Sequence, residues 1–268
     1  MLITINHDYQ FHYVLVGDRH KPVILFLHGF MGNCNDFSIV VEHLSFCCLM
    51  VDLPGHGKTE VAQDINYQMP QLALALTTLL EQLNIQKCYL VGYSMGGRLA
   101  LYLAVYFPHY FSAVVLESAS PGLKTQLERD RRIVHDLKLA RQLESGTLTQ
   151  FVQQWYTNPL FTSFTHHPNY QQAIAQRLKN NPLKLAKSLR HMGLATQPCL
   201  WNNLAEVQIR LILVVGELDP KFIAINRQIA NLCSAACLKI IKNCGHNVHF
   251  EQPIEFSNLI KYLKILSS

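Results

Sequence analysis

The sequence predicts an α/β fold with a mostly parallel central sheet flanked by helices and an inserted helical lid, and three observations lead to it. Short apolar runs rich in Val, Ile and Leu recur along the chain, with helix-like stretches between them. This alternation is interrupted between residues 121 and 203, where helix-like segments follow one another. No apolar run approaches the roughly 18 to 20 residues that a bilayer span needs, so we expect a soluble protein without a membrane span.

Six apolar runs have the continuous hydrophobicity of strands that are buried on both faces of a parallel sheet. In chain order they cover residues 22–28, 47–52, 88–93, 113–118, 211–216 and 237–242. Segments 69–83 and 223–233 are predicted to be helices between them. The N-terminal segment 1–13 has no basic start and no uninterrupted apolar stretch, so it is predicted to be a first strand and not a signal peptide.

The interruption of the alternation predicts a lid over residues 121–203, inserted into a core of residues 1–120 and 204–268. Its helix-like segments are 127–146, 147–156 and 170–193, and prolines punctuate them at Pro159, Pro168 and Pro182. Between residues 121 and 200 there are 11 Lys and Arg against 4 Asp and Glu, a net charge of +7, whereas the rest of the chain has 12 against 14, or −2. The lid is therefore the basic part of the protein.

The basic lid predicts a small anionic partner. Nucleic acid would also be attracted to such a charge, but the sequence contains no run of consecutive basic residues and no recognisable nucleic-acid module, so we expect no nucleic-acid partner. The eight cysteines include the adjacent Cys47 and Cys48 and form no CxxC motif. This usage suits buried thiols in a reducing cytoplasm, and neither it nor the scattered histidines predict a zinc site.

Ser94 stands in a G-x-S-x-G pattern, between Gly92 and Gly96, where the strand 88–93 gives way to a helix-like run. Such a pattern at a strand-to-helix turn predicts a nucleophile elbow, in which small neighbours permit the strained turn that exposes the serine hydroxyl. The helix that follows directs its N-terminal N–H groups at the same place. A five-residue pattern is weak by itself, so the prediction depends on partners elsewhere in the chain.

The partners follow in the order serine, acid, histidine, each after the end of a predicted strand. Asp219 follows the strand 211–216, and His246 follows the strand 237–242. We predict that Asp219 orients His246 and that His246 takes a proton from Ser94. Glu117, at the end of the strand 113–118, is the alternative acid, because some proteins of this architecture place the acid after the preceding strand.

The loop 27–32, "LHGFMG", follows the first long strand, and its glycines allow a close backbone approach to a substrate. The N–H of Phe30 is therefore predicted to form an oxyanion hole with the N–H of Met95. Three further histidines, His28, His56 and His249, are interpreted as structural residues of their loops.

The motifs "LHGF", "DLPGHG", "GYSMGG", the late Asp219 and the "GH" at His246 resemble the α/β-hydrolase superfamily over the whole chain. The segments "LVGYSMGGR", "SPGL" followed by arginines at 129 and 132, "WY" and "PLF" within 155–161, and "GELDPKF" resemble one family in it. That family is the 2-succinyl-6-hydroxy-2,4-cyclohexadiene-1-carboxylate synthases of menaquinone and phylloquinone biosynthesis.

This resemblance implies a lyase that eliminates pyruvate from 2-succinyl-5-enolpyruvyl-6-hydroxy-3-cyclohexene-1-carboxylate, with Ser94 as the base and no cofactor or metal. It also implies that Arg129 and Arg177 bind carboxylates of the substrate. Arg98 is also predicted to bind a carboxylate of the substrate, because it lies one helical turn after Ser94 and so near the same pocket. Trp155 and Tyr93 are predicted to be pocket walls, with core packing as the alternative, and Lys221 is a further candidate for substrate binding.

Two other functions are compatible with the same residues. A carboxylesterase, thioesterase or C–C hydrolase would use Ser94 as a covalent nucleophile, although the basic lid speaks against it. A catalytically inactive protein of the same fold would bind a small molecule without turnover. The chain is expected to be a monomer or a small homo-oligomer.

Overall fold

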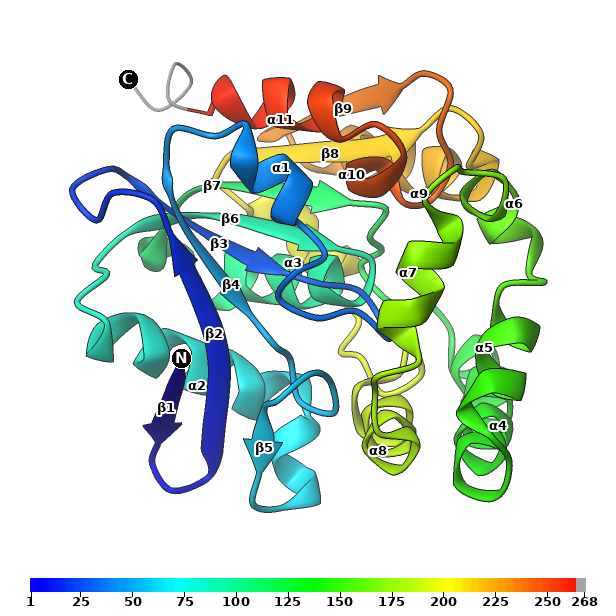
Figure 1. Ribbon diagram of the computed structural model, residues 1–268. Coiled ribbons are helices and arrows are strands. Elements are labelled where there is room, and N and C mark those ends of the chain that lie inside the picture. The colour runs from blue at the N-terminus through cyan, green and yellow to red at the C-terminus, as the bar shows by residue number, and fades with distance from the viewer. Residues whose placement is uncertain (264–268) are drawn as a thin grey trace.

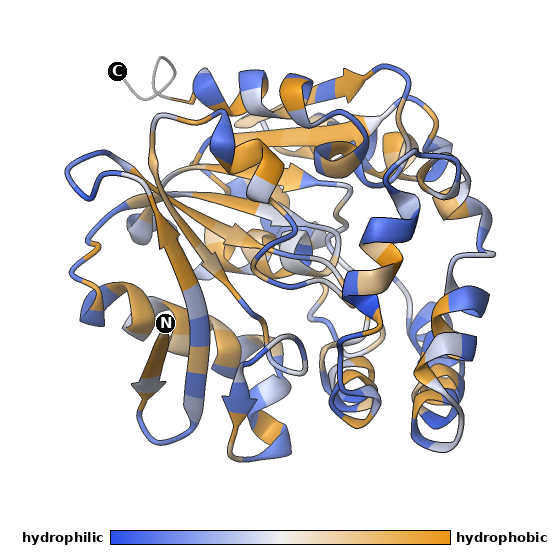
Figure 2. Cartoon of the chain, in the orientation of Figure 1, coloured by the Kyte–Doolittle hydropathy of each residue, from blue (hydrophilic) through white to orange (hydrophobic). Residues whose placement is uncertain are grey.

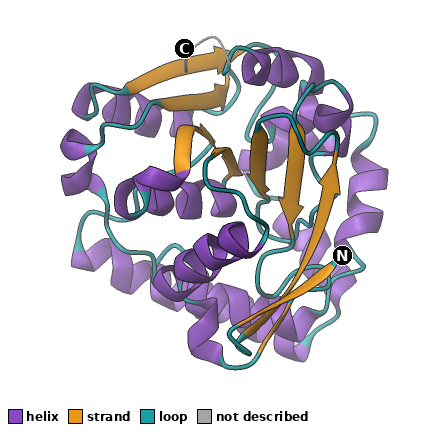
Figure 3. Ribbon diagram, turned by 90° about the vertical axis from the view of Figure 1, so that its left-hand side faces the viewer, coloured by secondary structure: helices purple, strands orange, loops and turns teal. Residues whose placement is uncertain are grey.

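A central sheet runs through the middle of the molecule, and helices cover both of its faces (Figures 1 and 3). This computed structural model describes residues 1–263. Within them the strand order is β1-β2-β4-β3-β6-β7-β8-β9, and β5 pairs with β2. The strands are β1 Leu2–Ile5, β2 Tyr9–Val16, β3 Val23–Leu27, β4 Cys47–Val51, β5 Glu60–Val61, β6 Cys88–Tyr93, β7 Phe111–Glu117, β8 Leu211–Gly216 and β9 Ala236–Ile241.

The predicted α/β fold is confirmed, because every ladder from β4 through β3, β6, β7 and β8 to β9 is parallel. The N-terminal segment differs from the prediction of one strand, since β1 and β2 form an antiparallel hairpin. Asn6 and His7 make its turn with positive φ angles of 50° and 60°. Asparagine and histidine are among the residues that most readily adopt this conformation, which allows the chain to reverse there.

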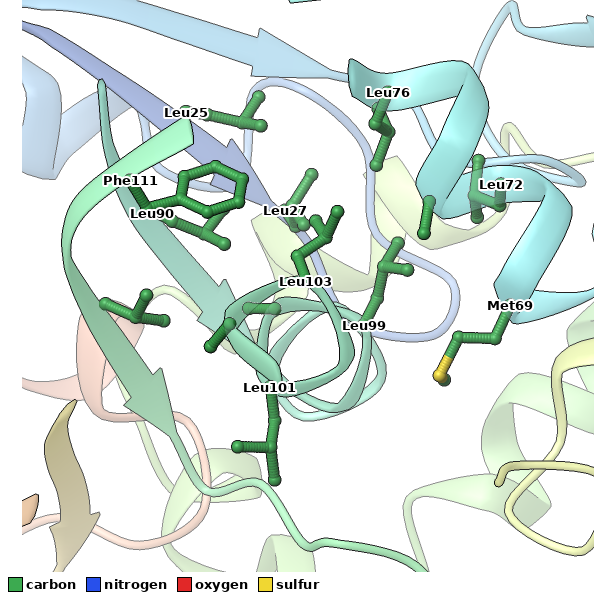
Figure 4. Close-up of a cluster of buried hydrophobic side chains, with 14 of the residues drawn as sticks. Leu25, Leu27, Met69, Leu72, Leu76, Leu90, Leu99, Leu101, Leu103 and Phe111 are labelled. Carbon is green, nitrogen blue, oxygen red and sulfur yellow. The ribbon is translucent and has the colours of Figure 1, made fainter. Parts of the chain in front are cut away.

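The helices of the sheet layers are α1 Ser38–Glu42, α2 Met69–Gln82, α3 Met95–Tyr106, α9 Pro220–Leu232, α10 Val248–Glu251 and α11 Pro253–Lys261. One apolar layer lies between the sheet and α2 and α3, where leucines of the strands and of both helices meet (Figure 4). A second layer, with Phe26, Phe37 and Phe256, lies on the opposite face beneath α1 and α11. Figure 2 shows the central strands as hydrophobic along most of their length, as burial on both faces requires.

Between β7 and β8 the chain leaves the sheet and forms the helices α4 Gln126–Ser145, α5 Leu148–Trp155, α6 Thr162–Thr165, α7 Tyr170–Arg177 and α8 Pro182–Met192. They stand together beside the edge of the sheet at which β6 and β7 end (Figure 1). The segment predicted as one helix over 170–193 is two helices. The first ends at Arg177, and Asn181 caps the start of α8, because its side chain accepts hydrogen bonds from the N–H groups of Leu183 and Lys184.

The inserted helices have a small apolar core of their own, which includes Leu143, Phe151, Phe164 and Leu185. Met31, from the loop after β3, is fully buried in this core and so joins it to the sheet domain. Four short 3₁₀ segments complete the described chain: η1 Asp64–Tyr67, η2 Pro108–Tyr110, η3 Pro159–Phe161 and η4 Trp201–Glu206. Among residues 1–263, no helix has the length and apolarity needed to cross a membrane.

Candidate active site

Ser94 occupies a strained turn between β6 and α3, with φ 49° and ψ −103°. Such backbone angles are costly for a residue other than glycine and persist where the surroundings enforce them. The surroundings here are close: a Cβ atom on Gly96 would lie 2.2 Å from the carbonyl oxygen of Leu27. Only glycine therefore lets α3 begin so near the loop after β3, and this contact holds the serine at the carboxyl end of the sheet.

The three residues of the predicted triad are brought together from the ends of β6, β8 and β9. His246 Nε2 lies 3.1 Å from Ser94 Oγ, and His246 Nδ1 lies 2.8 Å from Asp219 Oδ2. The other carboxylate oxygen of Asp219 accepts the N–H of Phe222 at the start of α9, which fixes the acid. Because a carboxylate can only accept, Nδ1 carries the proton of the neutral ring and Nε2 is free to accept from the serine hydroxyl.

Glu117, the alternative acid, contacts a different histidine. Its carboxylate accepts hydrogen bonds from the backbone N–H of His249 at 3.0 Å and from His249 Nδ1 at 2.8 Å. Both side chains are buried, and the carbonyl of Glu117 also accepts the N–H of Ser94. The structure therefore places Glu117 beneath the elbow as an anchor of α10, and places Asp219 at His246.

Phe30 and Met95 line the same cavity as Ser94, and their backbone N–H groups have no acceptor among the described residues. In the described residues, the N–H of Phe30 and the N–H of Met95 donate no hydrogen bond, whereas the next N–H, that of Gly96, donates to the carbonyl of His28 at 3.1 Å. The loop before Phe30 is held by His28, which donates from Nδ1 to the carbonyl of Gly29 and accepts the N–H of Leu53 at Nε2. Burial lowers the pKa of His28, so its ring stays neutral in this bridging role.

A cavity of about 500 Å³ opens in front of Ser94, between the sheet and the inserted helices. Arg98, Arg132 and Lys221 contribute to its wall, together with Ser94 and His246. Within the described chain no aspartate or glutamate lines this cavity. The side of the serine that is open to a ligand is therefore electropositive.

Arg98 is the most deeply placed of these cations. Its guanidinium donates to Gln197 Oε1 and to the carbonyl of Met192, both at 3.1 Å, so its partners are neutral. Burial, and next the nearby charge of Arg132, lower the pKa of Arg98 to about 10. It remains charged at neutral pH, and a ligand carboxylate would accept charge-assisted hydrogen bonds from it.

Comparisons with known proteins identify the family of this chain. Residues 22–253 match the α/β hydrolase fold family. A 2-succinyl-6-hydroxy-2,4-cyclohexadiene-1-carboxylate synthase of Salmonella typhimurium is 35% identical over 238 residues, which cover 88% of this chain and 91% of that protein. A Bacillus subtilis protein assigned to the same synthase is 36% identical over 269 residues, 96% of each chain. The solved structure of MenH from S. aureus superposes with a TM-score of 0.90 at 32% identity, covering 96% of this chain and 98% of that one.

This chain belongs to the α/β-hydrolase family of these synthases. The resemblance predicted from its sequence motifs is thereby confirmed for both the fold and the family. In this chain, the structure separates the charged residues that line the cavity from those that lie outside it.

Arg132, which was not among the predicted site residues, lines the cavity, and Arg129, which was, does not. Arg129 lies one turn earlier on α4 and donates to the carbonyl of Leu123 at 3.4 Å. The two arginines lie about 4.5 Å apart along the helix axis, and Arg132 is the one whose side chain faces the cavity. Arg132 is held by Asp136 at 2.7 Å, one turn further along the same helix. This i,i+4 pairing with Asp136 is the sequence signal that could have found it.

Arg177 borders a smaller space that Ser94 also lines, and its carboxylate-binding role stays a prediction. Its guanidinium forms a buried ion pair with Asp36 at 2.7 Å and donates to the carbonyl of Met31. Burial would raise the pKa of Asp36, but the guanidinium outweighs this and lowers it below its usual value. The charge of Arg177 is thus compensated inside the protein, and it tethers the Phe30 loop from the lid side.

The remaining predicted residues lie at the site. Trp155 and Lys221 line the main cavity, and the Trp155 ring packs against Phe30 with 5.0 Å between ring centroids. Tyr93 lines a smaller space of about 30 Å³ behind Ser94, which Trp155 and Arg177 also border. Its ring lies against the rings of His246 and His249, so Tyr93 supports the histidines and does not face the main cavity.

One cluster in the described chain combines metal-ligand types: His12, Cys34 and Asp52. Asp52 already accepts hydrogen bonds from the N–H groups of Cys34 and Lys58 and pairs with His12 at 2.7 Å. Burial, and next the charge of Asp52, raise the pKa of the Cys34 thiol to about 12. The thiol therefore keeps its proton at neutral pH, and the hydrogen bonds of the cluster hold the loop after β3.

Proposed function

We propose that this protein is the lyase that eliminates pyruvate from 2-succinyl-5-enolpyruvyl-6-hydroxy-3-cyclohexene-1-carboxylate, forming 2-succinyl-6-hydroxy-2,4-cyclohexadiene-1-carboxylate. The observation that carries the proposal is a serine–histidine pair that opens into a cavity walled by Arg98, Arg132 and Lys221 and by no carboxylate of the described chain. The substrate carries three carboxylates, and guanidinium groups bind carboxylates through charge-assisted hydrogen bonds.

In this reaction Ser94 acts as a base and not as a nucleophile. His246 takes the hydroxyl proton, and the serine oxygen then removes a proton from the ring carbon next to the succinyl ketone. The electron pair moves into the ketone, and the N–H groups of Phe30 and Met95 stabilise the enolate oxygen. When the enolate collapses, the bond from the ring to the enolpyruvyl oxygen breaks, and the leaving group takes a proton to become pyruvate. Asp219 keeps His246 oriented and stabilises its charged form.

The free N–H groups support this assignment of the oxyanion hole, because each lacks another acceptor in the described residues. The distances around His246 support the proton transfer, since both ring nitrogens already make the required contacts. Arg98 supports a polyanionic substrate, because its hydrogen bonds go to neutral groups and a second cation, Arg132, lies near it. We further propose a cytoplasmic location, in agreement with eight free cysteines.

Pyruvate release from the enolpyruvyl substrate, with the Ser94→Ala variant as the control, tests the proposal. We expect pyruvate and a conjugated ring diene that absorbs in the near ultraviolet to appear together, and no acyl adduct on Ser94 in rapidly quenched samples. An acyl-serine that forms and decays at the turnover rate would instead indicate a hydrolase. Absence of pyruvate, with efficient ester cleavage, would refute the lyase assignment.

A further inference from the structure

The loop that carries His246 is fastened by one buried carboxylate, that of Glu251. The N–H of Gly245 donates to Glu251 Oε2 at 3.0 Å, and the N–H of Asn247 donates to Glu251 Oε1 at 3.3 Å. The two donors are the residues immediately before and after His246. One side chain therefore holds the peptide on both sides of the histidine.

Among the described residues, the side chain of Glu251 makes no hydrogen bond or ion pair other than the bonds to these two N–H groups. Glu251 is 7% exposed, and among residues 1–263 it has no ion-pair partner. Burying a carboxylate without a counter-charge costs free energy unless hydrogen bonds compensate, and its hydrogen-bond partners are the two N–H groups of the loop.

The side-chain contacts of His246 do not fix its position by themselves, so the backbone of the loop must do so. The imidazole is surrounded by the rings of Tyr93, Phe161 and Phe222, with centroids 4.6 to 5.8 Å away. Ring contacts of this kind are individually weaker than a hydrogen bond to a charged group. The ring's polar contacts are those to Asp219 and Ser94, and both depend on where the backbone presents it.

We propose that Glu251 is a positioning residue that holds His246 between Asp219 and Ser94 by binding the N–H groups on either side of it. This inference rests on the proposed function only in taking His246 as the group that moves the proton. A misplacement of about 1 Å can cost roughly a hundredfold in rate, so the clamp matters for turnover more than for binding.

Glu251→Gln provides the test, because it keeps the size of the side chain and removes one acceptor. Its amide NH₂ must face one of the two N–H donors, so one hydrogen bond is lost and the loop is no longer held on both sides. Glu217→Gln is the matched control: Glu217 is exposed and accepts the N–H of Asn243 at 3.3 Å in the same loop, three residues before His246.

Two measurements report on the histidine without the native substrate. The first is the rate at which a fluorophosphonate probe labels Ser94, and the second is the low-field proton resonance of His246 Nδ1–H, assigned with His246→Gln. In Glu251→Gln we expect labelling to slow by about 10- to 100-fold and the resonance to shift or broaden. With the enolpyruvyl substrate, we expect kcat to fall by a similar factor and KM to change less than about twofold.

Glu251→Asp guards against a variant that merely unfolds. It is one methylene shorter and reaches only one N–H group, but its charged carboxylate is a stronger acceptor than the amide of Glu251→Gln, so we expect partial recovery of the labelling rate over that variant. The proposal is overturned if labelling and the resonance in both variants equal those of the wild type, or if labelling only follows the folded fraction measured by circular dichroism. Slowed labelling in Glu251→Gln, together with no pyruvate release by the wild type, would leave the clamp standing and refute the proposed lyase.

Discussion

Arg98→Ala removes the buried guanidinium that we expect to bind a substrate carboxylate. Two of its N–H groups are used by Gln197 and Met192, and the rest are available to a ligand in the cavity. A hydrogen bond to a charged group contributes about 1.5 to 3 kcal/mol, which at about 1.4 kcal/mol per tenfold is about a 12- to 140-fold loss. We therefore expect kcat/KM for pyruvate release to fall by that factor.

The assay follows pyruvate at several substrate concentrations, with thermal unfolding measured on the same preparation. Arg131→Ala is the matched control, because Arg131 is exposed and lies next to Arg132 without lining the cavity. Its kcat/KM should stay within about twofold of the wild type, since exposed charges contribute little. If Arg98→Ala folds normally and retains the wild-type kcat/KM, the electropositive cavity does not bind the substrate as we infer.

Three further predictions concern the acid of the triad, the tether of the oxyanion loop and a buried histidine. Asp219→Asn should lower kcat by roughly 10³- to 10⁴-fold, whereas Glu117→Gln should lower the melting temperature and reduce kcat by less than about tenfold; the reverse ranking in steady-state kinetics would make Glu117 the acid. Arg177→Ala should lower the free energy of unfolding by about 3 to 5 kcal/mol in urea titrations, because it leaves Asp36 buried without its partner; a loss below about 1 kcal/mol would contradict this role. Burial lowers the pKa of His56 from 6.5 to about 3. Between these two pH values His56 is protonated in the unfolded chain and neutral in the folded chain. Stability should therefore fall as the pH falls through this window, and less steeply in His56→Gln; identical slopes in urea titrations at several pH values would refute the linkage.

Much of the fold follows from local patterns in the sequence. The runs at 88–93 and 211–216 coincide with β6 and β8, because continuous apolar stretches between turn residues have few alternatives to a buried parallel strand. The N-terminal hairpin was missed, since its reversal depends on the positive φ angles of Asn6 and His7 and not on glycine or proline.

The sequence by itself determined the order of serine, acid and histidine at the ends of strands, and with it the meeting of Ser94, Asp219 and His246 at one edge of the sheet. Only the tertiary structure decided the partners of the charged groups. Arg177 pairs with Asp36, which lies 141 residues away in the chain, and no pattern around either residue indicates this contact. The physical reason is that a strand or an elbow is specified by its neighbours in sequence, whereas the charge a ligand meets depends on which buried groups from distant segments have already been paired.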